Sequence, residues 1–131
     1  MLEIRAELKG GVKVNAYIAG HEIKTDQKPE DGGENTAPDP FQYFLASLAA
    51  CTGYYVAKFC LTRDIPTDGI RVVQRVIPDP TGYVDTLEVD IELPASFPEK
   101  YREAVLKAGS QCMVKKTLEN PPEIVVQTVV R

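Results

Sequence analysis

The sequence predicts an α+β fold in which antiparallel strands pack around one long central helix. Two observations lead to this prediction. Segments that alternate between apolar and polar residues stand on both sides of a single long apolar helical segment, and the strands occur as adjacent hairpins instead of alternating βαβ units. The length of 131 residues suits one domain covering residues 1–131.

The charge and the apolar content narrow the class of protein. Fifteen basic residues against nineteen acidic ones give a net charge of −4, so we expect neither nucleic acid nor an anionic membrane surface as a partner. Charged residues interrupt the first twenty positions, which argues against a secretory signal and favours the cytoplasm. The uncharged stretch 41–57 is shorter than the roughly 20 residues of a membrane span, so we interpret it as a buried core helix.

The amino-terminal part is predicted to be a small antiparallel meander. Apolar and charged residues alternate over residues 2–24, the Gly10-Gly11 pair marks a tight hairpin turn, and Gly20 marks a second turn. Residues 26–39 are rich in proline, glycine and acidic residues, so we expect a long exposed loop there. Its length makes it a mild indication of function.

The central helix has a clear start signal. Asp39 is placed to be the N-cap, Pro40 the first helical residue, and Gln42 the partner that reaches back in a capping box. Gly53 is costly in a helix interior, so it suggests the close approach of another backbone or of a second subunit. Apolar positions recur at spacings of three and four, at Phe41, Phe44, Leu45, Leu48, Thr52, Tyr55, Val56 and Phe59.

Further strands are expected after this helix. Residues 70–77 and 83–93 have strand character and are joined by the turn 78–82. Residues 123–130 are expected to form a last strand.

Two shorter helices are expected between these strands. Residues 98–108 have helical composition and are stopped by Gly109. A separate helix over 110–118 would be capped by Ser110, which puts Cys112 in its first turn.

The three cysteines are the candidates for chemistry, and each has a structural alternative. Cys51 shares a helix face with Phe44, Leu48 and Tyr55, where a thiol more often only packs. Cys112 in a first helical turn, with Lys115 and Lys116 following it, could be stabilised as a thiolate. Cys60 lies half a turn out of phase with Cys51 and is interpreted as structural. Neither these cysteines nor the lone His21 show the spacing of metal ligands, so no metal and no cofactor are predicted.

Two segments carry a family resemblance. The stretches GGENTAPDPFQYFLASLAACT (32–52) and QCMVKKTLENPPEIVV (111–126) resemble the OsmC/Ohr family, in particular its OsmC-like branch. The resemblance implies an intertwined homodimer in which strands of both subunits wrap two central helices. It also implies a reactive thiol at Cys51, a resolving thiol at Cys112, and reduction of peroxides in oxidative or osmotic stress defence.

The chain departs from the family pattern at two positions. The family peroxidases support the reactive thiolate with an arginine from the early loop and a glutamate directly after the helix-opening proline, whereas Phe41 follows Pro40 here. The charges that could substitute are Arg5 and Lys115. A thiol in an apolar pocket without a cation is expected to have a raised pKa and to react slowly.

Two function hypotheses from different classes therefore stay open. The first is a peroxide reductase that prefers organic hydroperoxides, with a pocket formed by Phe44, Leu48 and Tyr55, a minor role for Gln42, and an external thiol reductant. The alternative is a non-catalytic dimeric module that binds a small apolar ligand at the subunit interface. A third, a hot-dog-like thioesterase, would need a carboxylate or histidine near the helix start, where Phe41 and Gln42 stand.

Overall fold

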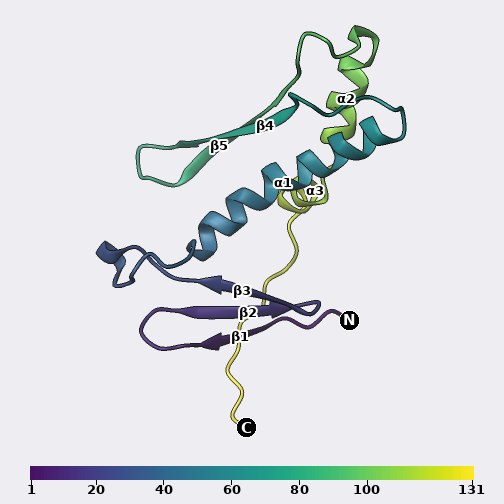
Figure 1. The fold of residues 1–131 in the computed structure, drawn as a ribbon. Helices are drawn as coiled ribbons and strands as arrows, with labels where there is room; N and C mark the ends of the chain where they lie inside the picture. The colour runs from purple at the N-terminus through teal and green to yellow at the C-terminus, as the bar shows by residue number, and fades with distance from the viewer. The chain divides into compact units, whose positions relative to one another are not determined.

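The computed structural model describes residues 1–131, which form two compact units, Met1–Ala46 and Ser47–Arg131. The boundary between them falls within the helix α1 (Pro40–Leu61). Both units contain antiparallel strands, and the helices follow the strands instead of alternating with parallel ones (Figure 1). The predicted α+β class is confirmed.

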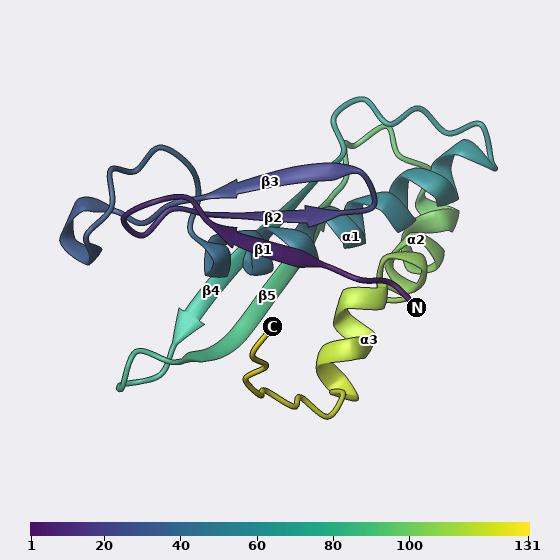
Figure 2. The same cartoon turned by 90° about the horizontal axis from the view of Figure 1, so that it is seen from below.

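The first unit contains the predicted meander. Its strands β1 (Arg5–Leu8), β2 (Val14–Ile18) and β3 (His21–Thr25) lie side by side in the order β1-β2-β3 (Figure 2). Gly10 and Gly11 have φ angles of 100° and 57°, which side-chain-bearing residues rarely adopt, and they form the first turn as expected.

The segment after β3 is organised around a buried carboxylate. Asp26 is only 1% exposed, and its oxygens accept hydrogen bonds from the Thr36 hydroxyl at 2.6 Å and from the backbone N–H groups of Thr36, Gln27 and Glu34. A 3-10 helix, η1 (Pro29–Asp31), lies within the enclosed loop. The expectation of a simply exposed loop is therefore wrong for Asp26, because a carboxylate that accepts four hydrogen bonds tolerates burial.

The start of α1 follows the predicted capping box. The backbone N–H of Gln42 donates to Asp39 Oδ1 at 2.8 Å, and the N–H of Asp39 donates to Gln42 Oε1 at 3.0 Å. The hydroxyl of Tyr43 donates to the carbonyl of Lys24 at 2.8 Å, which ties the first turn of the helix to β3.

In the second unit, the carboxyl half of α1 packs with a hairpin and two short helices. The hairpin consists of β4 (Arg71–Pro78) and β5 (Val84–Glu92), paired antiparallel with an irregularity at Ile77/Pro78. After η2 (Glu99–Tyr101) come α2 (Arg102–Gly109) and α3 (Met113–Glu119). The core is apolar and consists of Val56, Phe59, Cys60, Ile65, Phe97 and Val105.

Gly109 marks the closest approach between elements of this unit. A Cβ atom at this position would lie 2.7 Å from Ile91 Cδ1, on β5, and 3.3 Å from Thr52 Cγ2, on α1. The last residue of α2 can therefore pack at this point only because it has no side chain.

Two predictions at the carboxyl end are wrong. Ser110 does not cap the last helix, because its hydroxyl donates back to the carbonyl of Leu106 at 2.9 Å and ends α2; Cys112 is the N-cap of α3 instead. Residues 123–130 form no strand, and Val126 and Val130 are 89% and 98% exposed. A strand needs a partner strand, and no backbone hydrogen bond joins this segment to any of the five strands.

The central helix is less buried than its composition predicts. Only five of its residues are buried: Leu48, Thr52, Val56, Phe59 and Cys60. By length and composition α1 could also cross a membrane, with 28% of the relevant window buried. One such helix is weak evidence for a membrane span, since core helices of soluble proteins meet the same criterion.

Candidate active site: two thiols at the start of α3

The structure brings Cys51 and Cys112 together. Cys51 lies in the middle of α1 and is partly exposed, whereas Cys112 precedes α3 and is fully buried. The Cys112 thiol lies close enough to the sulfur of Cys51 to lower the pKa of Cys51. Both residues belong to the unit Ser47–Arg131, so this contact lies inside one compact part of the molecule.

The first turn of α3 supplies further donors to the two sulfurs. The backbone N–H groups of Val114 and Met113 lie near the sulfur of Cys51 and lower its pKa. The N–H of Lys115 donates to Cys112 Sγ at 3.5 Å, which is the N-cap hydrogen bond of the helix. A helix leaves the amide groups of its first turn without partners in the helix. At the start of α3 these groups lie next to the two cysteine sulfurs.

The surroundings shift the two thiol pKa values in opposite directions. Burial opposes ionisation of Cys51, but the N–H of Val114, the thiol of Cys112 and the N–H of Met113 outweigh it, so that the pKa of Cys51 is lowered. Burial raises the pKa of Cys112, and so does its role as hydrogen-bond donor to Cys51. Cys51 therefore ionises more readily than Cys112.

This result corrects two expectations. A raised pKa was expected for Cys51 because no cation stands beside it, but backbone amides take the place of the cation. The first turn of α3 was expected to stabilise a thiolate at Cys112. Its Lys115 and Val114 N–H groups do lower the pKa of Cys112, but burial and the neighbouring Cys51 outweigh them, so this pKa is raised.

The two residues considered for charge support are engaged elsewhere. Arg5 Nε pairs with Glu7 Oε2 at 2.7 Å, and its guanidinium carbon lies 4.8 Å from the centroid of the Tyr17 ring. Lys115 Nζ pairs with Glu119 at 3.0 Å, so Lys115 reaches the site through its backbone N–H and not through its ammonium group. No lysine or arginine side chain is among the groups that shift the pKa of Cys51.

The residues expected to line a pocket lie in several environments. Leu48 and Tyr55 lie one turn before and one turn after Cys51 on α1; Leu48 is buried and Tyr55 is half-buried with its ring edge-on to Tyr54. Phe44 is exposed and stacks on Phe41 in the unit Met1–Ala46.

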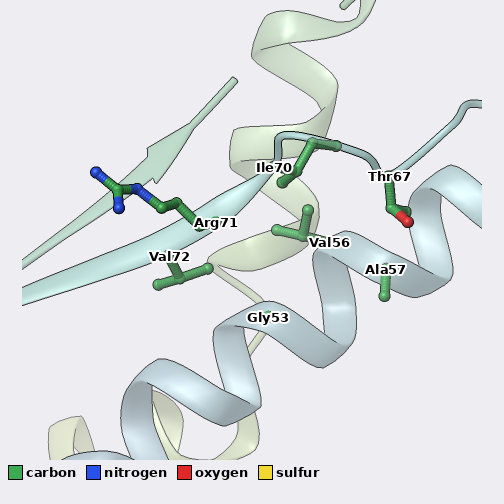
Figure 3. A pocket seen from close by; sticks show the side chains of 7 residues that line it. All are labelled: Gly53, Val56, Ala57, Thr67, Ile70, Arg71 and Val72. Carbon is green, nitrogen blue, oxygen red and sulfur yellow. The ribbon is translucent and has the colours of Figure 1, made fainter. Parts of the chain in front are cut away.

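The sequence interpretation missed a pocket on α1. It has a volume of about 210 Å³ and is lined by Gly53, Val56, Ala57, Thr67, Ile70, Arg71 and Val72 (Figure 3). A Cβ atom at Gly53 would meet only Val72 Cγ2, at 3.9 Å, so no backbone of this chain approaches the glycine. Because Gly53 is two positions from Cys51 on the helix, the pocket opens on another face of α1 than the thiol pair. The only feature of the sequence that indicated this pocket is Gly53 in the middle of the helix.

Cys60 and His21 have surroundings that give no indication of a reactive role. Cys60 is fully buried in the apolar core, and burial raises the pKa of its thiol, in agreement with a structural role. His21 is exposed at the start of β3. No group of three or more histidine, cysteine, aspartate or glutamate side chains gathers to hold a metal ion.

Comparison with models of protein families identifies the family to which the chain belongs. The model for OsmC-like proteins matches residues 32–127, which include both thiols of the site. The chain belongs to the OsmC-like family. No curated protein matches the chain.

Solved structures of the OsmC-like fold agree with this assignment. A hypothetical protein from Aquifex aeolicus VF5 is similar, with a TM-score of 0.70 and 18% identity over 92% of this chain and 89% of that one. An OsmC-like protein from Mycoplasma pneumoniae has a TM-score of 0.66 and 19% identity over 92% and 89%. The organic hydroperoxide resistance protein OhrB of Bacillus subtilis has a TM-score of 0.54 and 18% identity over 92% of each chain. Identities this low show a common fold.

Proposed function

We propose that this OsmC-like chain is a thiol-dependent peroxide reductase that prefers organic hydroperoxides, with Cys51 as the nucleophile and Cys112 as the resolving thiol. One observation carries the proposal: a partly exposed thiol with a lowered pKa lies in hydrogen-bond contact with a buried thiol whose pKa is raised. A low pKa, access and a neighbouring resolving thiol are the properties of redox-active cysteines.

The reaction follows from these two protonation states. The Cys51 thiolate attacks one oxygen of the hydroperoxide, the O–O bond breaks, and the departing alkoxide takes up a proton to leave as an alcohol. Cys51 is thereby oxidised to a sulfenic acid. The sulfur of Cys112 then displaces the hydroxyl group from Cys51, which leaves as water after protonation, and a disulfide forms. An external dithiol returns both cysteines to the reduced state by exchange.

Backbone amides give the thiolate a fixed environment. The N–H groups of Met113 and Val114 lower the pKa of Cys51 and are held by the helix geometry of α3, so they need no rearrangement when the charge forms. Being uncharged, they also stabilise the thiolate without attracting competing counterions. In this proposal the amides take the role that an arginine has in the family peroxidases.

The proposal includes a homodimer. Val76, Ile77 and Tyr83 of the β4–β5 hairpin are exposed, and a two-stranded hairpin with an uncovered apolar surface is marginally stable on its own. Residues 123–130 have the composition of a strand and pair with nothing within the chain. A second copy would cover the exposed part of α1 and offer a sheet edge to this segment. We place the enzyme in the cytoplasm, where its thiols stay reduced.

The printed names of two structural relatives support the proposed substrate. The Bacillus subtilis protein and a protein from Legionella pneumophila with a TM-score of 0.56 are both described as organic hydroperoxide resistance proteins. An apolar helix face around the nucleophile, with Leu48 and Tyr55 on adjacent turns, suits the alkyl part of such a peroxide.

A second candidate is a non-catalytic dimeric module that binds a small apolar ligand. Two observations favour it: no cationic side chain supports Cys51, and the pocket at Gly53 is lined mainly by apolar groups. Small apolar molecules are the ligands that such a lining favours.

Stopped-flow consumption of cumene hydroperoxide by the reduced protein separates the two candidates. The reductase predicts consumption at least a hundredfold faster than by a free thiol, abolished by Cys51→Ser. Cys112→Ser should still complete one turnover and leave a sulfenic acid that dimedone traps. The matched control is Cys60→Ser, which should consume peroxide at the wild-type rate. Slow consumption with all thiols left reduced would favour the binding module.

A further inference from the structure

Gly109, the last residue of α2, stands where the backbone does not require a glycine. It is buried, and its φ angle is not among the positive ones, so an alanine could adopt the same backbone conformation. Apart from proline, glycine is the least favourable residue in a helix. The reason for a glycine at this position therefore lies in the atoms that surround it.

Three side chains leave no room for a Cβ atom at Gly109. The atom would lie 2.7 Å from Ile91 Cδ1, 3.3 Å from Thr52 Cγ2 and 3.4 Å from Val56 Cγ2. Ile91 is itself packed against the core, and Thr52 and Val56 are β-branched residues of α1 whose χ1 angles are restricted in a helix. A side chain at Gly109 would therefore press α2 away from both β5 and α1.

This contact is adjacent in sequence to both thiols of the site. Thr52 directly follows Cys51 on α1, and Cys112 is the third residue after Gly109. The two residues between them, 110 and 111, donate backbone hydrogen bonds to carbonyl oxygens of α2 at 3.0 Å and 3.1 Å. Because this connection is short and held by hydrogen bonds, a displacement of Gly109 is transmitted to Cys112.

We propose that Gly109 is a positioning residue, whose missing side chain lets α2 pack directly on α1 and thereby sets the separation of Cys51 and Cys112. The inference rests on the thiol pair of the proposed function. There, the sulfur of Cys112 displaces the hydroxyl group from the sulfenic acid of Cys51, and this group leaves as water with the proton of the Cys112 thiol.

The geometry of a disulfide explains why this separation matters. The two Cβ atoms of a disulfide lie about 3.5–4.5 Å apart, a range of about 1 Å. Bringing the 2.7 Å contact at Gly109 to the ordinary carbon separation of about 3.5–4.0 Å needs a shift of similar size. One added methyl group at Gly109 is therefore enough to move the two thiols out of the bonding range.

Equilibration with glutathione tests the inference without peroxide. One oxidised glutathione takes up the two electrons and two protons of the thiol pair, so the protein gains a disulfide and two molecules of reduced glutathione are released. The equilibrium constant of this exchange reports how well the fold holds the two sulfurs together. We expect Gly109→Ala to lower the constant for the Cys51–Cys112 disulfide by about tenfold or more.

A rescue variant separates positioning from a general loss of stability. Ile91→Val removes the Cδ1 atom that lies closest to the added methyl group, so Gly109→Ala combined with Ile91→Val should return the constant to within about threefold of the wild-type value. The control Ile65→Val removes a methyl group from the same core without adding volume at Gly109, and it should leave the constant unchanged.

A second variant covers the case in which Gly109→Ala does not fold. Thr52→Ile adds a methyl group from the α1 side of the same contact and should also lower the constant, whereas the similarly shaped Thr52→Val should not. Circular dichroism shows which variants are folded.

Equal constants in the wild type and in both enlarged variants would overturn the inference. An equal loss in Ile65→Val, or failure of glutathione to join Cys51 and Cys112 in the wild type, would also overturn it. A protein whose disulfide is weakened by Gly109→Ala, restored by Ile91→Val and yet consumes no peroxide would keep this inference and lose the proposed function.

Discussion

Cys112 lies beside Cys51, and the pKa values of the two thiols shift in opposite directions: the neighbouring Cys112 helps to lower that of the partly exposed Cys51, whereas burial raises that of Cys112. The same contact places the second sulfur next to the first, where it can attack a sulfenic acid without a large rearrangement. In the proposed mechanism, activation and resolution both depend on one short stretch of chain, Cys112 and the first turn of α3.

Removing one backbone donor should raise the pKa of Cys51. Met113→Pro deletes the Met113 N–H at the first helical position, where proline is well tolerated, and the φ and ψ angles of Cys112, −52° and 126°, suit a residue before proline. The pH dependence of the alkylation rate of Cys51 measures the effect. Met113→Ala keeps the N–H and is the control; the same titration in both variants would show that this amide does not act on Cys51.

Two glycine substitutions should change stability in opposite directions. Gly53→Ala is expected to raise the free energy of unfolding by about 1 kcal/mol, because the new Cβ meets only an atom at 3.9 Å and alanine favours a helix. Gly109→Ala is expected to lower it by about 1–3 kcal/mol, since its Cβ would lie 2.7 Å from Ile91 Cδ1. Urea unfolding of both variants is the measurement. A destabilised Gly53→Ala would mean that something outside the chain fills the space at this glycine.

The loop after β3 should depend on the charge of Asp26. The Thr36 hydroxyl and the backbone N–H groups of Thr36, Gln27 and Glu34 hold the pKa of this carboxyl well below its ordinary value of 3.8. A lowered pKa contributes stability that is fully present above pH 3.8 and is lost as the pH falls below it. Asp26→Asn should reduce stability at pH 7 and remove this acid dependence. The exposed Asp31→Asn is the control, and unchanged urea midpoints in Asp26→Asn would contradict the role of the carboxylate.

The buried thiol of Cys60 should make the protein less stable in alkali. Burial raises its pKa above the ordinary value of 9.0, so the unfolded chain releases the proton at a lower pH than the folded protein does. The free energy of unfolding should therefore fall as the pH rises through 9. The difference in stability between wild type and Cys60→Ala, followed from pH 7 to 10.5, isolates this contribution. A difference that stays constant with pH would show that Cys60 titrates normally.

Local signals were sufficient for much of the fold. The capping box between Asp39 and Gln42 could be predicted because both partners lie within one turn, and the hairpin turn at Gly10-Gly11 because its backbone conformation favours glycine. The prediction of Ser110 as the capping residue of α3 was wrong. The Ser110 hydroxyl can bond to the helix before it or to the helix after it, and which one it chooses depends on where α2 ends. The strand predicted over residues 123–130 has no hydrogen-bonded partner strand, which local composition does not reveal.

The site was less predictable than the fold. Helical phase placed Cys51 on an apolar face, but its pairing with Cys112 followed only from the family resemblance, since nothing in the spacing shows that α3 returns to α1. The sign of the pKa shift at Cys51 depends on two backbone N–H groups and one thiol from a distant segment of the chain. Such donors belong to every residue except proline and therefore leave no mark in the side-chain pattern.

The central claim, that Cys51 and Cys112 act as a peroxide-reducing pair, is tested most directly by the products of a single turnover. Reduced protein is mixed with one equivalent of cumene hydroperoxide, and the alcohol, the remaining thiols and the disulfide peptides are measured together. We predict one alcohol and one Cys51–Cys112 disulfide per chain, with Cys60 still reduced. Unreacted peroxide with three free thiols, or a disulfide that joins any other pair of cysteines, would contradict the claim.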